Sequence, residues 1–525
     1  MRNLFQEKYY LIFFLFLSFY YFFAKYYSSD FFFVNDDFTM LELKNSNYYE
    51  AFFFTDSWWR PFKNLFYNYL NINYYLSTNF IINIKVFLHI IITFVIYLYF
   101  VFYSKNKFLS LVLSLFFLFH QSSVIAIYGL DTFGQLVCTI FGILSFIFIM
   151  SYCNFKKAKY LYFSIVLSAF SLLSKENAIS FIFINSLTLI FFNVENKIFD
   201  LKKQFSKNFF PILLFFLLVI IYLFLRYYLN ASWQLNSGSE RYSINIIYFF
   251  KNLFQFNFSV LNPIDNTFIY LLLKNLGYQN ILFLIIFILI SLSYIFLCSN
   301  FSFSQNLLKY FLIFVLSGFP VFLISHTSEL YTYHSVFFLC FFLLNLIMIK
   351  KKNFFNQYSI LFVLIFFSCL SQYTKINNMN KNSILSKKLF DYFSEISRDE
   401  NLFENLYFLE NKDDFTKYSN FKLNSFENFV PRFFIRKNFN YDIIPIRENN
   451  KEFLSNGKTF KINYGDGLET IPPNILSNEN FTLFYLDVYR KPMSFKQLLS
   501  YFFFEDQCVL VIKPIKTINQ KICNY

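Results

Sequence analysis

Charged residues are scarce in this sequence: Asp, Glu, Lys and Arg make up 15% of 525 residues, whereas hydrophobic residues make up 56%. Soluble globular domains carry about 25% charged residues, so the balance excludes an ordinary soluble protein and indicates that lipid surrounds much of the chain. Glycine and proline are also rare, at 9 and 10 residues. Transporters commonly contain helices interrupted by these residues, so a transporter or lipid-linked sugar flippase stays only as the alternative.

Metal-binding and nucleic-acid-binding patterns are missing as well. The seven cysteines show no paired metal-ligand spacing. The net charge is +14, but its lysines and arginines fall in short clusters between apolar runs, which is typical of membrane-protein loops and argues against a nucleic-acid partner. Cys508 and Cys523 lie in the polar C-terminal region, where a disulfide is an open alternative if that region is extracytoplasmic.

Apolar segments of the length needed to cross a bilayer, about 20 residues, recur along the first two thirds of the chain. They predict an all-α polytopic membrane protein with about eleven spans. These lie near residues 9–27, 80–103, 108–128, 131–152, 159–173, 177–193, 209–229, 279–298, 308–325, 334–350 and 356–372.

The basic clusters predict an orientation, because lysine and arginine concentrate in cytoplasmic loops. With the N-terminus inside, alternation places every basic cluster between spans on the cytoplasmic side, at residues 105–107, 156–159, 197–207 and 350–352. The long loops 28–79 and 230–278 then lie outside. We therefore predict a transmembrane core at 1–372 and, with strand-like runs at 481–488 and 508–512, a small extracytoplasmic α+β domain at 373–525.

Two adjacent carboxylates follow the first predicted span, in the sequence Phe-Phe-Phe-Val-Asn-Asp-Asp-Phe that contains Asp36 and Asp37. Flanking aromatic residues would hold these side chains near the outer membrane surface. A carboxylate there can act as a general base, with its pKa raised by burial and by its neighbour. The alternative is a solvated turn.

Several other ionisable side chains also fall near the outer membrane border, where such residues often serve a purpose. Arg60 and Lys175 can bind a phosphate carried on a lipid, or these two cations can simply reach toward lipid head groups; Arg226 lies near the same border. The remaining candidates are His120, Glu176, Glu329 and Tyr331. His120 can be a metal ligand, although the absence of a close second histidine favours a structural role.

Six short sequence blocks, which include several of these residues, resemble in their order the membrane glycosyltransferases of the GT-C superfamily, in particular the protein O-mannosyltransferase and TMTC-like branch. The blocks cover residues 30–335. They are Asn-Asp-Asp-Phe at 35–38, Trp-Arg-Pro-Phe at 59–62, the stretch 83–89 ending in His, Phe-His at 119–120 with 124–127, Ser-Lys-Glu-Asn at 174–177, and Glu-Leu-Tyr at 329–331. Gln121 and Leu330 stand where the family has Pro and Arg.

The resemblance implies a GT-C-like fold and transfer of a sugar, with inversion, from a polyprenyl-phosphate donor to an acceptor hydroxyl on the outer side of the membrane. By analogy Asp36 is the base, Asp37 orients the acceptor or a divalent cation, and Arg60, Lys175 and Arg226 face the donor phosphate. The acceptor class stays open among protein, lipid and glycan. A bacterial inner membrane is the expected location, and no cofactor beyond that optional cation is expected.

Two further interpretations of the sequence stay open, one as another enzyme and one as a structural protein. An O-antigen ligase or polymerase also handles lipid-linked sugars outside the membrane, but it would not need the early Asp-Asp loop. A structural assembly protein would use the C-terminal region as a binding module, and its outer ionisable residues would then have no common role.

Overall fold

The computed structural model of the protein describes most of the first 396 residues and five strand segments after them. The described residues are 2–27, 31–32, 47–53, 59–74, 77–192, 205–229, 247–264, 305–319, 321–323, 329–349, 354–396, 405–411, 440–446, 452–455, 458–461 and 481–486. Asp36, Asp37, Cys508, Cys523 and the predicted span 279–298 lie outside them.

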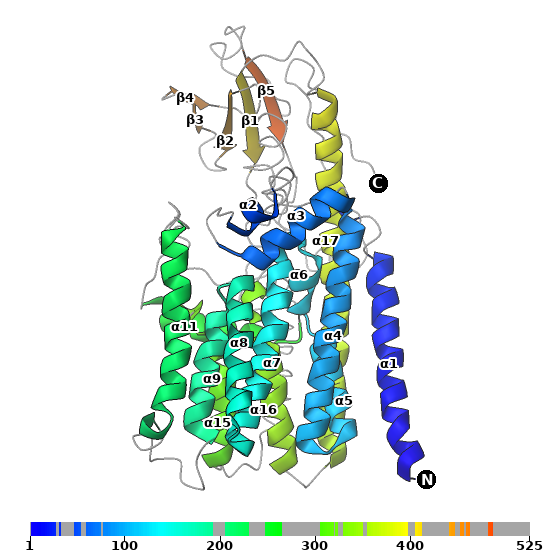
Figure 1. The fold of residues 1–525 in the computed structure, drawn as a ribbon. Coiled ribbons are helices and arrows are strands. Elements are labelled where there is room, and N and C mark those ends of the chain that lie inside the picture. The colour runs from blue at the N-terminus through cyan, green and yellow to red at the C-terminus, as the bar shows by residue number, and fades with distance from the viewer. Residues whose placement is uncertain are drawn as a thin grey trace. The chain divides into compact units, whose positions relative to one another are not determined.

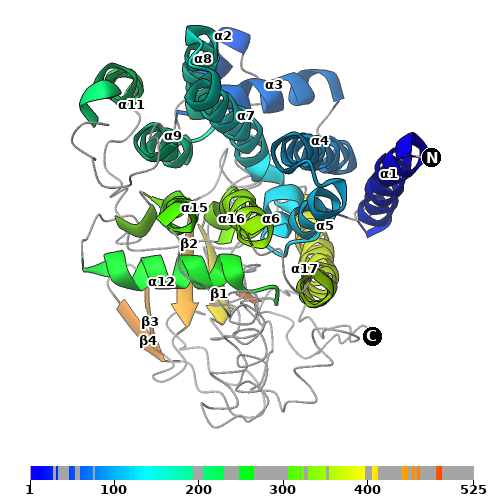
Figure 2. The ribbon, with the colours of Figure 1, turned by 90° about the horizontal axis from the view of Figure 1, so that it is seen from below.

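The chain divides into two compact units. The first comprises Met1–Ser29, Glu42–Asp265 and Ile286–Tyr373, and the second comprises Asp30–Leu41, Asn266–Ile285 and Thr374–Tyr525. The described part of the first unit is built from helices (Figures 1 and 2). They are α1 (Arg2–Tyr27), α2 (Tyr48–Phe53), α3 (Pro61–Tyr74), α4 (Thr78–Ser104), α5 (Lys107–Leu118), α6 (Ser123–Tyr128), α7 (Phe133–Phe155), α8 (Ala158–Ser174), α9 (Ala178–Phe192), α11 (Phe209–Tyr228), α12 (Tyr248–Leu261), α15 (Gln305–Val315), α16 (Ser335–Ile349) and the start of α17 (Phe354–Ile396).

Five of the described helical segments are long and apolar enough to cross a membrane, which is consistent with an all-α multi-pass membrane protein. They are Lys8–Tyr27, Thr78–Ser104, Leu130–Phe155, Phe209–Tyr228 and Gln357–Asn377, and each overlaps a span predicted from the sequence. Five further apolar helices are shorter, at 10–17 residues: Lys107–Leu118, Ala158–Ser174, Ala178–Phe192, Leu307–Gly318 and Ser335–Ile349.

The segment predicted as a span at 108–128 does not form a single helix. The chain leaves the helix after Leu118 and begins another at Ser123, so α5 and α6 are separate. The intervening sequence His-Gln-Ser-Ser is polar, and its side chains bond to other segments instead of facing lipid. The amide of Gln121, for example, donates to the carbonyl oxygens of Ser259 (3.3 Å) and Asn262 (3.1 Å).

Short polar turns join the antiparallel helices. Asn106 caps α5, because its side-chain oxygen accepts a hydrogen bond from the backbone N–H of Leu109 at 3.0 Å. Lys105 and Lys156 end α4 and α7 in the left-handed conformation, with φ of 58° and 55°. These two turns place both lysines at the same end of the helices, where α1 also begins (Figure 1).

Small polar side chains hold α7 against α8 and α9. The Ser145 hydroxyl lies 2.9 Å from that of Ser164 and 2.8 Å from that of Ser168, and the Asn185 amide donates to Ser145 at 2.8 Å. All four side chains are buried. Such residues allow close helix contact in lipid, where the hydrophobic effect does not drive helices together.

The described strands belong to the second unit. A three-stranded parallel sheet has the order β2-β1-β5, and β3 pairs with β4 in an antiparallel ladder. Their bounds are β1 (Asn405–Asn411), β2 (Asn440–Ile446), β3 (Glu452–Ser455), β4 (Lys458–Lys461) and β5 (Phe481–Leu486). The strand β5 falls within the predicted run 481–488, whereas the run 508–512 lies outside the described residues.

Candidate functional site

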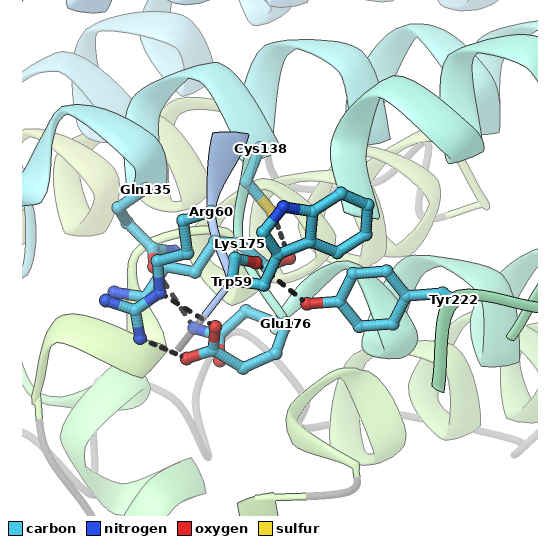
Figure 3. Close-up of polar contacts among 8 residues, drawn as sticks. Trp59, Arg60, Gln135, Cys138, Lys175, Glu176 and Tyr222 are labelled. Carbon is cyan, nitrogen blue, oxygen red and sulfur yellow. Dashed lines mark hydrogen bonds and ion pairs between the residues drawn. The ribbon is translucent and has the colours of Figure 1, made fainter. Parts of the chain in front are cut away.

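A bidentate ion pair joins the segment before α3 to the turn between α8 and α9. The Arg60 guanidinium donates from Nε to Oε2 of Glu176 at 2.9 Å and from Nη2 to Oε1 at 2.5 Å (Figure 3). The two side chains are 15% and 16% exposed. A planar fork on a carboxylate fixes orientation as well as charge, so the pair holds these two segments in one arrangement.

Aromatic contacts position the backbone on the Arg60 side of the pair. The Trp59 indole N–H donates to the carbonyl oxygen of Phe52 at 3.0 Å. Its ring stacks on that of Tyr222, with 6.0 Å between centroids, and the Tyr222 hydroxyl lies 3.4 Å from the Trp59 carbonyl oxygen (Figure 3). The residue before Arg60 is therefore fixed between α2 and α11.

A close helix approach positions the other side of the pair. A Cβ atom at Gly134, in the first turn of α7, would lie 2.6 Å from the carbonyl oxygen of Ser174. Only glycine leaves room for the end of α8 at this point. The next residues along the chain are Lys175 and Glu176, so the packing of Gly134 sets where both charged side chains begin.

Lys175 is a buried cation that forms no ion pair in the described structure. Its side chain is 5% exposed, and Nζ lies 5.7 Å from the ring centroid of Tyr331. Within the described residues, Nζ makes neither a hydrogen bond nor an ion pair. Burying an ammonium group is costly unless an anion or acceptor meets it, so the position of Nζ suits an anionic ligand.

The buried side chain of Gln135 contributes a second donor beside Lys175. Its oxygen Oε1 accepts from the Asn177 amide at 3.1 Å, which leaves Nε2 as the other amide atom. Nε2 is buried and has no hydrogen-bond partner among the described residues. Figure 3 shows Gln135 next to Arg60 and Lys175. Two adjacent unused donors favour a ligand that only accepts hydrogen bonds.

Charge and burial set the protonation of the site. Burial, with the neighbouring Arg60 charge, lowers the pKa of Lys175 to about 8, although Glu176 and Asp131 oppose the shift. Burial alone would raise the pKa of Glu176, but the charge and hydrogen bonds of Arg60, together with the charge of Lys175, lower it to about 2. At neutral pH Glu176 is therefore ionised, and Lys175 carries its positive charge.

The structure brings some of the predicted site residues together and separates others. Arg60, Lys175, Glu176 and Tyr331 meet, and Arg226 lies one turn beyond Tyr222 on the same face of α11. Glu329 begins the 3-10 turn Glu329–Thr332 that carries Tyr331.

His120 is buried elsewhere. Its Nε2 donates to the Val260 carbonyl oxygen at 3.0 Å, and its Nδ1 accepts the Ser122 backbone N–H at 3.2 Å. Both ring nitrogens are thus used for packing. Within the described residues, no group of three His, Cys, Asp or Glu side chains is placed to hold a metal ion.

The sequence pattern indicates no separate role for Gln135, Asn177 or Lys85. The Lys85 ammonium, fully buried on α4, donates to the Thr132 hydroxyl at 2.6 Å and to the Gly129 carbonyl oxygen, and so ties α4 to the turn before α7. An ionisable residue inside an apolar span was a usable signal for Lys85. Neutral amides such as Gln135 give no comparable signal in sequence.

No protein-family model, curated protein or solved structure matches this chain. The resemblance to GT-C glycosyltransferases therefore depends on the residue blocks quoted from the sequence alone.

Proposed function

We propose that the protein is an integral membrane glycosyltransferase that moves a sugar from a polyprenyl-phosphate donor to an acceptor hydroxyl. The proposal includes the finer topology: about eleven spans, a cytoplasmic N-terminus, a GT-C-like core and an extracytoplasmic C-terminal domain. The observation that carries it is the pair of unused donors, Lys175 Nζ and Gln135 Nε2, fixed beside the Arg60–Glu176 pair. A donor phosphate offers acceptor oxygens and the negative charge that this arrangement lacks.

In this reaction the protein positions the donor, takes the proton of the acceptor hydroxyl and stabilises the departing phosphate. The acceptor oxygen attacks the anomeric carbon while the bond from that carbon to the phosphate oxygen breaks, with its electron pair leaving on the polyprenyl phosphate. Lys175 and Gln135 stabilise the charge that develops on that phosphate. Asp36 takes the acceptor proton, and attack from the face opposite the leaving group gives inversion. Glu176 holds Arg60 in position and stays ionised throughout.

The test is transfer of radiolabelled sugar from polyprenyl-phosphate donors in membranes that contain wild type or a variant at equal levels. General-base assistance is worth about 10² to 10⁴ in rate, so Asp36→Asn should be nearly inactive. Lys175→Gln should lose about 10- to 100-fold, the value of one charged hydrogen bond. The control is Lys251→Gln, which changes an exposed lysine on α12.

Two results would count against the proposal. Full activity in Asp36→Asn would show that Asp36 is not the base. Equal losses of activity in Lys175→Gln and Lys251→Gln would show that Lys175 does not bind the donor phosphate. Donor binding without transfer, together with movement of the donor between leaflets, would favour the flippase alternative.

A further inference from the structure

Four lysines gather at the end of α8 that is opposite the Arg60–Glu176 pair. Lys156, Lys157 and Lys159 lie at the turn between α7 and α8, and Lys207 lies just before α11; all four are exposed. We call these four residues the lysine cluster. The 17 residues of α8 separate it from the candidate site by roughly 25 Å at a rise of 1.5 Å per residue.

The cluster joins two loops that are distant in sequence. Burial lowers the pKa of Lys156 most, the Cys153 thiol opposes this effect, and the positive charge of Lys207 lowers the pKa further. The Cys153 thiol lies 3.9 Å from the Thr188 carbonyl oxygen, and the Asn208 amide donates to the next carbonyl oxygen, that of Leu189, at 3.1 Å. The end of α7 and the start of α11 therefore meet on neighbouring residues of α9, which brings the positive charges of the two loops together. Such an arrangement becomes favourable when an anion lies between the charges.

Carboxylates compensate little of this charge. Within the described structure, which omits residues 193–204, none of the four lysines makes an ion pair. In sequence, the segments 156–159 and 193–207 contain seven lysines against Glu195 and Asp200. The net charge of these two loops is thus strongly positive even with every residue counted.

The local backbone gains nothing from a lysine at position 156. Lys156 ends α7 with φ of 55°, and its N–H bonds to the Tyr152 carbonyl oxygen at 2.8 Å. The left-handed conformation costs a non-glycine residue roughly 1–2 kcal/mol, and glycine would adopt it freely. Lys105 ends α4 in the same way, with φ of 58°, and so offers a matched comparison.

Large exposed aromatic side chains lie next to the cluster. Phe155 is 52% exposed, Phe209 50% and Phe210 66%. They flank Lys156 and Lys207 at the ends of the apolar helices α7 and α11, where acyl chains meet head groups. Basic residues beside apolar side chains at this depth match the two parts of a lipid molecule.

We propose that the lysine cluster binds the head group of an anionic phospholipid, whose acyl chains lie along Phe155 and Phe209. The phosphate accepts hydrogen bonds from lysines of both loops and bridges them. The lipid thereby links the α7–α8 turn to the start of α11, which stabilises the bundle at the end distant from the candidate site.

The experiment measures the thermal unfolding temperature of the purified full-length protein in non-ionic detergent with added phosphatidylglycerol, phosphatidylcholine or inorganic phosphate. Lys156→Gly and Lys105→Gly relieve the same backbone conformation, so in detergent alone both should unfold no earlier than wild type. Phosphatidylglycerol should raise the unfolding temperature of wild type and Lys105→Gly. In Lys156→Gly its apparent affinity should fall roughly fivefold, the value of about one lysine at an anionic surface.

The exposed Lys207→Gln variant, which leaves the backbone unchanged, should show the same loss. Equal responses of Lys156→Gly and Lys105→Gly would overturn the proposal, because general surface charge would then explain lipid binding. A shift with inorganic phosphate as large as that with phosphatidylglycerol would overturn it too, since the site would then take a free anion. The proposal is supported if Lys156→Gly and Lys207→Gln lose affinity for phosphatidylglycerol, Lys105→Gly keeps it, and inorganic phosphate does not replace the lipid.

Discussion

Replacing Glu176 by Gln should destabilise the protein substantially, because two buried or half-buried cations then lose their nearest counter-charge. The Arg60–Glu176 pair lowers the pKa of Glu176 from 4.5 to about 2. One pKa unit corresponds to about 1.4 kcal/mol, so the ionised carboxylate is stabilised by roughly 3 kcal/mol. Removing one partner of a buried pair typically costs about 3–5 kcal/mol, which agrees in size.

The sign of the pH dependence follows from the direction of the shift. The folded-state pKa of Glu176 lies below the unfolded value, so its contribution is present above about pH 4.5 and is lost as the pH falls through about 2. Wild type should therefore lose stability across that window, and Glu176→Gln should lose less. Both proteins should be compared by thermal unfolding in detergent at pH 7 and at stepwise lower pH.

A matched control and a double variant make the test decisive. Glu50, an exposed carboxylate at the start of α2, bonds only locally to Asn47 in the described structure. Glu50→Gln should thus change stability by less than about 1 kcal/mol. Arg60→Gln/Glu176→Gln should be more stable than Glu176→Gln alone. If Glu176→Gln behaves like Glu50→Gln, or if the double variant is the less stable, the reasoning about the buried pair fails.

Three further predictions concern the same region. Lys175 has a folded pKa of about 8 against 10.5 when unfolded, so wild type should gain roughly 3 kcal/mol between those pH values; thermal unfolding of Lys175→Met should lack this rise. Gly134→Ala should lower the unfolding temperature and sugar transfer together, because its Cβ would lie 2.6 Å from the Ser174 carbonyl oxygen, and normal values for both would contradict the close packing. Tyr222→Phe keeps the ring on Trp59 and should cost at most about 1 kcal/mol, whereas Tyr222→Ala should cost several kcal/mol in the same unfolding assay; equal costs would contradict the stacking argument.

The sequence predicts the long apolar helices well because hydropathy is a local property of the sequence. The segment predicted at 131–152 corresponds to Leu130–Phe155, and that at 209–229 to Phe209–Tyr228. Hydropathy does not predict the helix break within 108–128, where the polar residues 120–123 separate α5 from α6. Their side chains find partners on α12 and α17, and such distant partners cannot be read from a local pattern.

The candidate site was predictable as a set of residue types and not as an arrangement. The sequence placed Arg60, Lys175 and Glu176 near the same membrane border. The sequence did not predict that the Arg60 guanidinium pairs with Glu176 across 116 residues. The neutral Gln135 became visible only through its unused amide donor.

The sequence separation of the Arg60–Glu176 pair also bears on how the protein is made. At a synthesis rate of about 5–20 residues per second, Glu176 follows Arg60 out of the ribosome by on the order of ten seconds. During that interval α4, α5 and α7 can insert, but the carboxylate that pairs with the Arg60 guanidinium has not yet been made. The bidentate pair can form only when the α8–α9 turn arrives, so a chain halted earlier in synthesis would have an incomplete site.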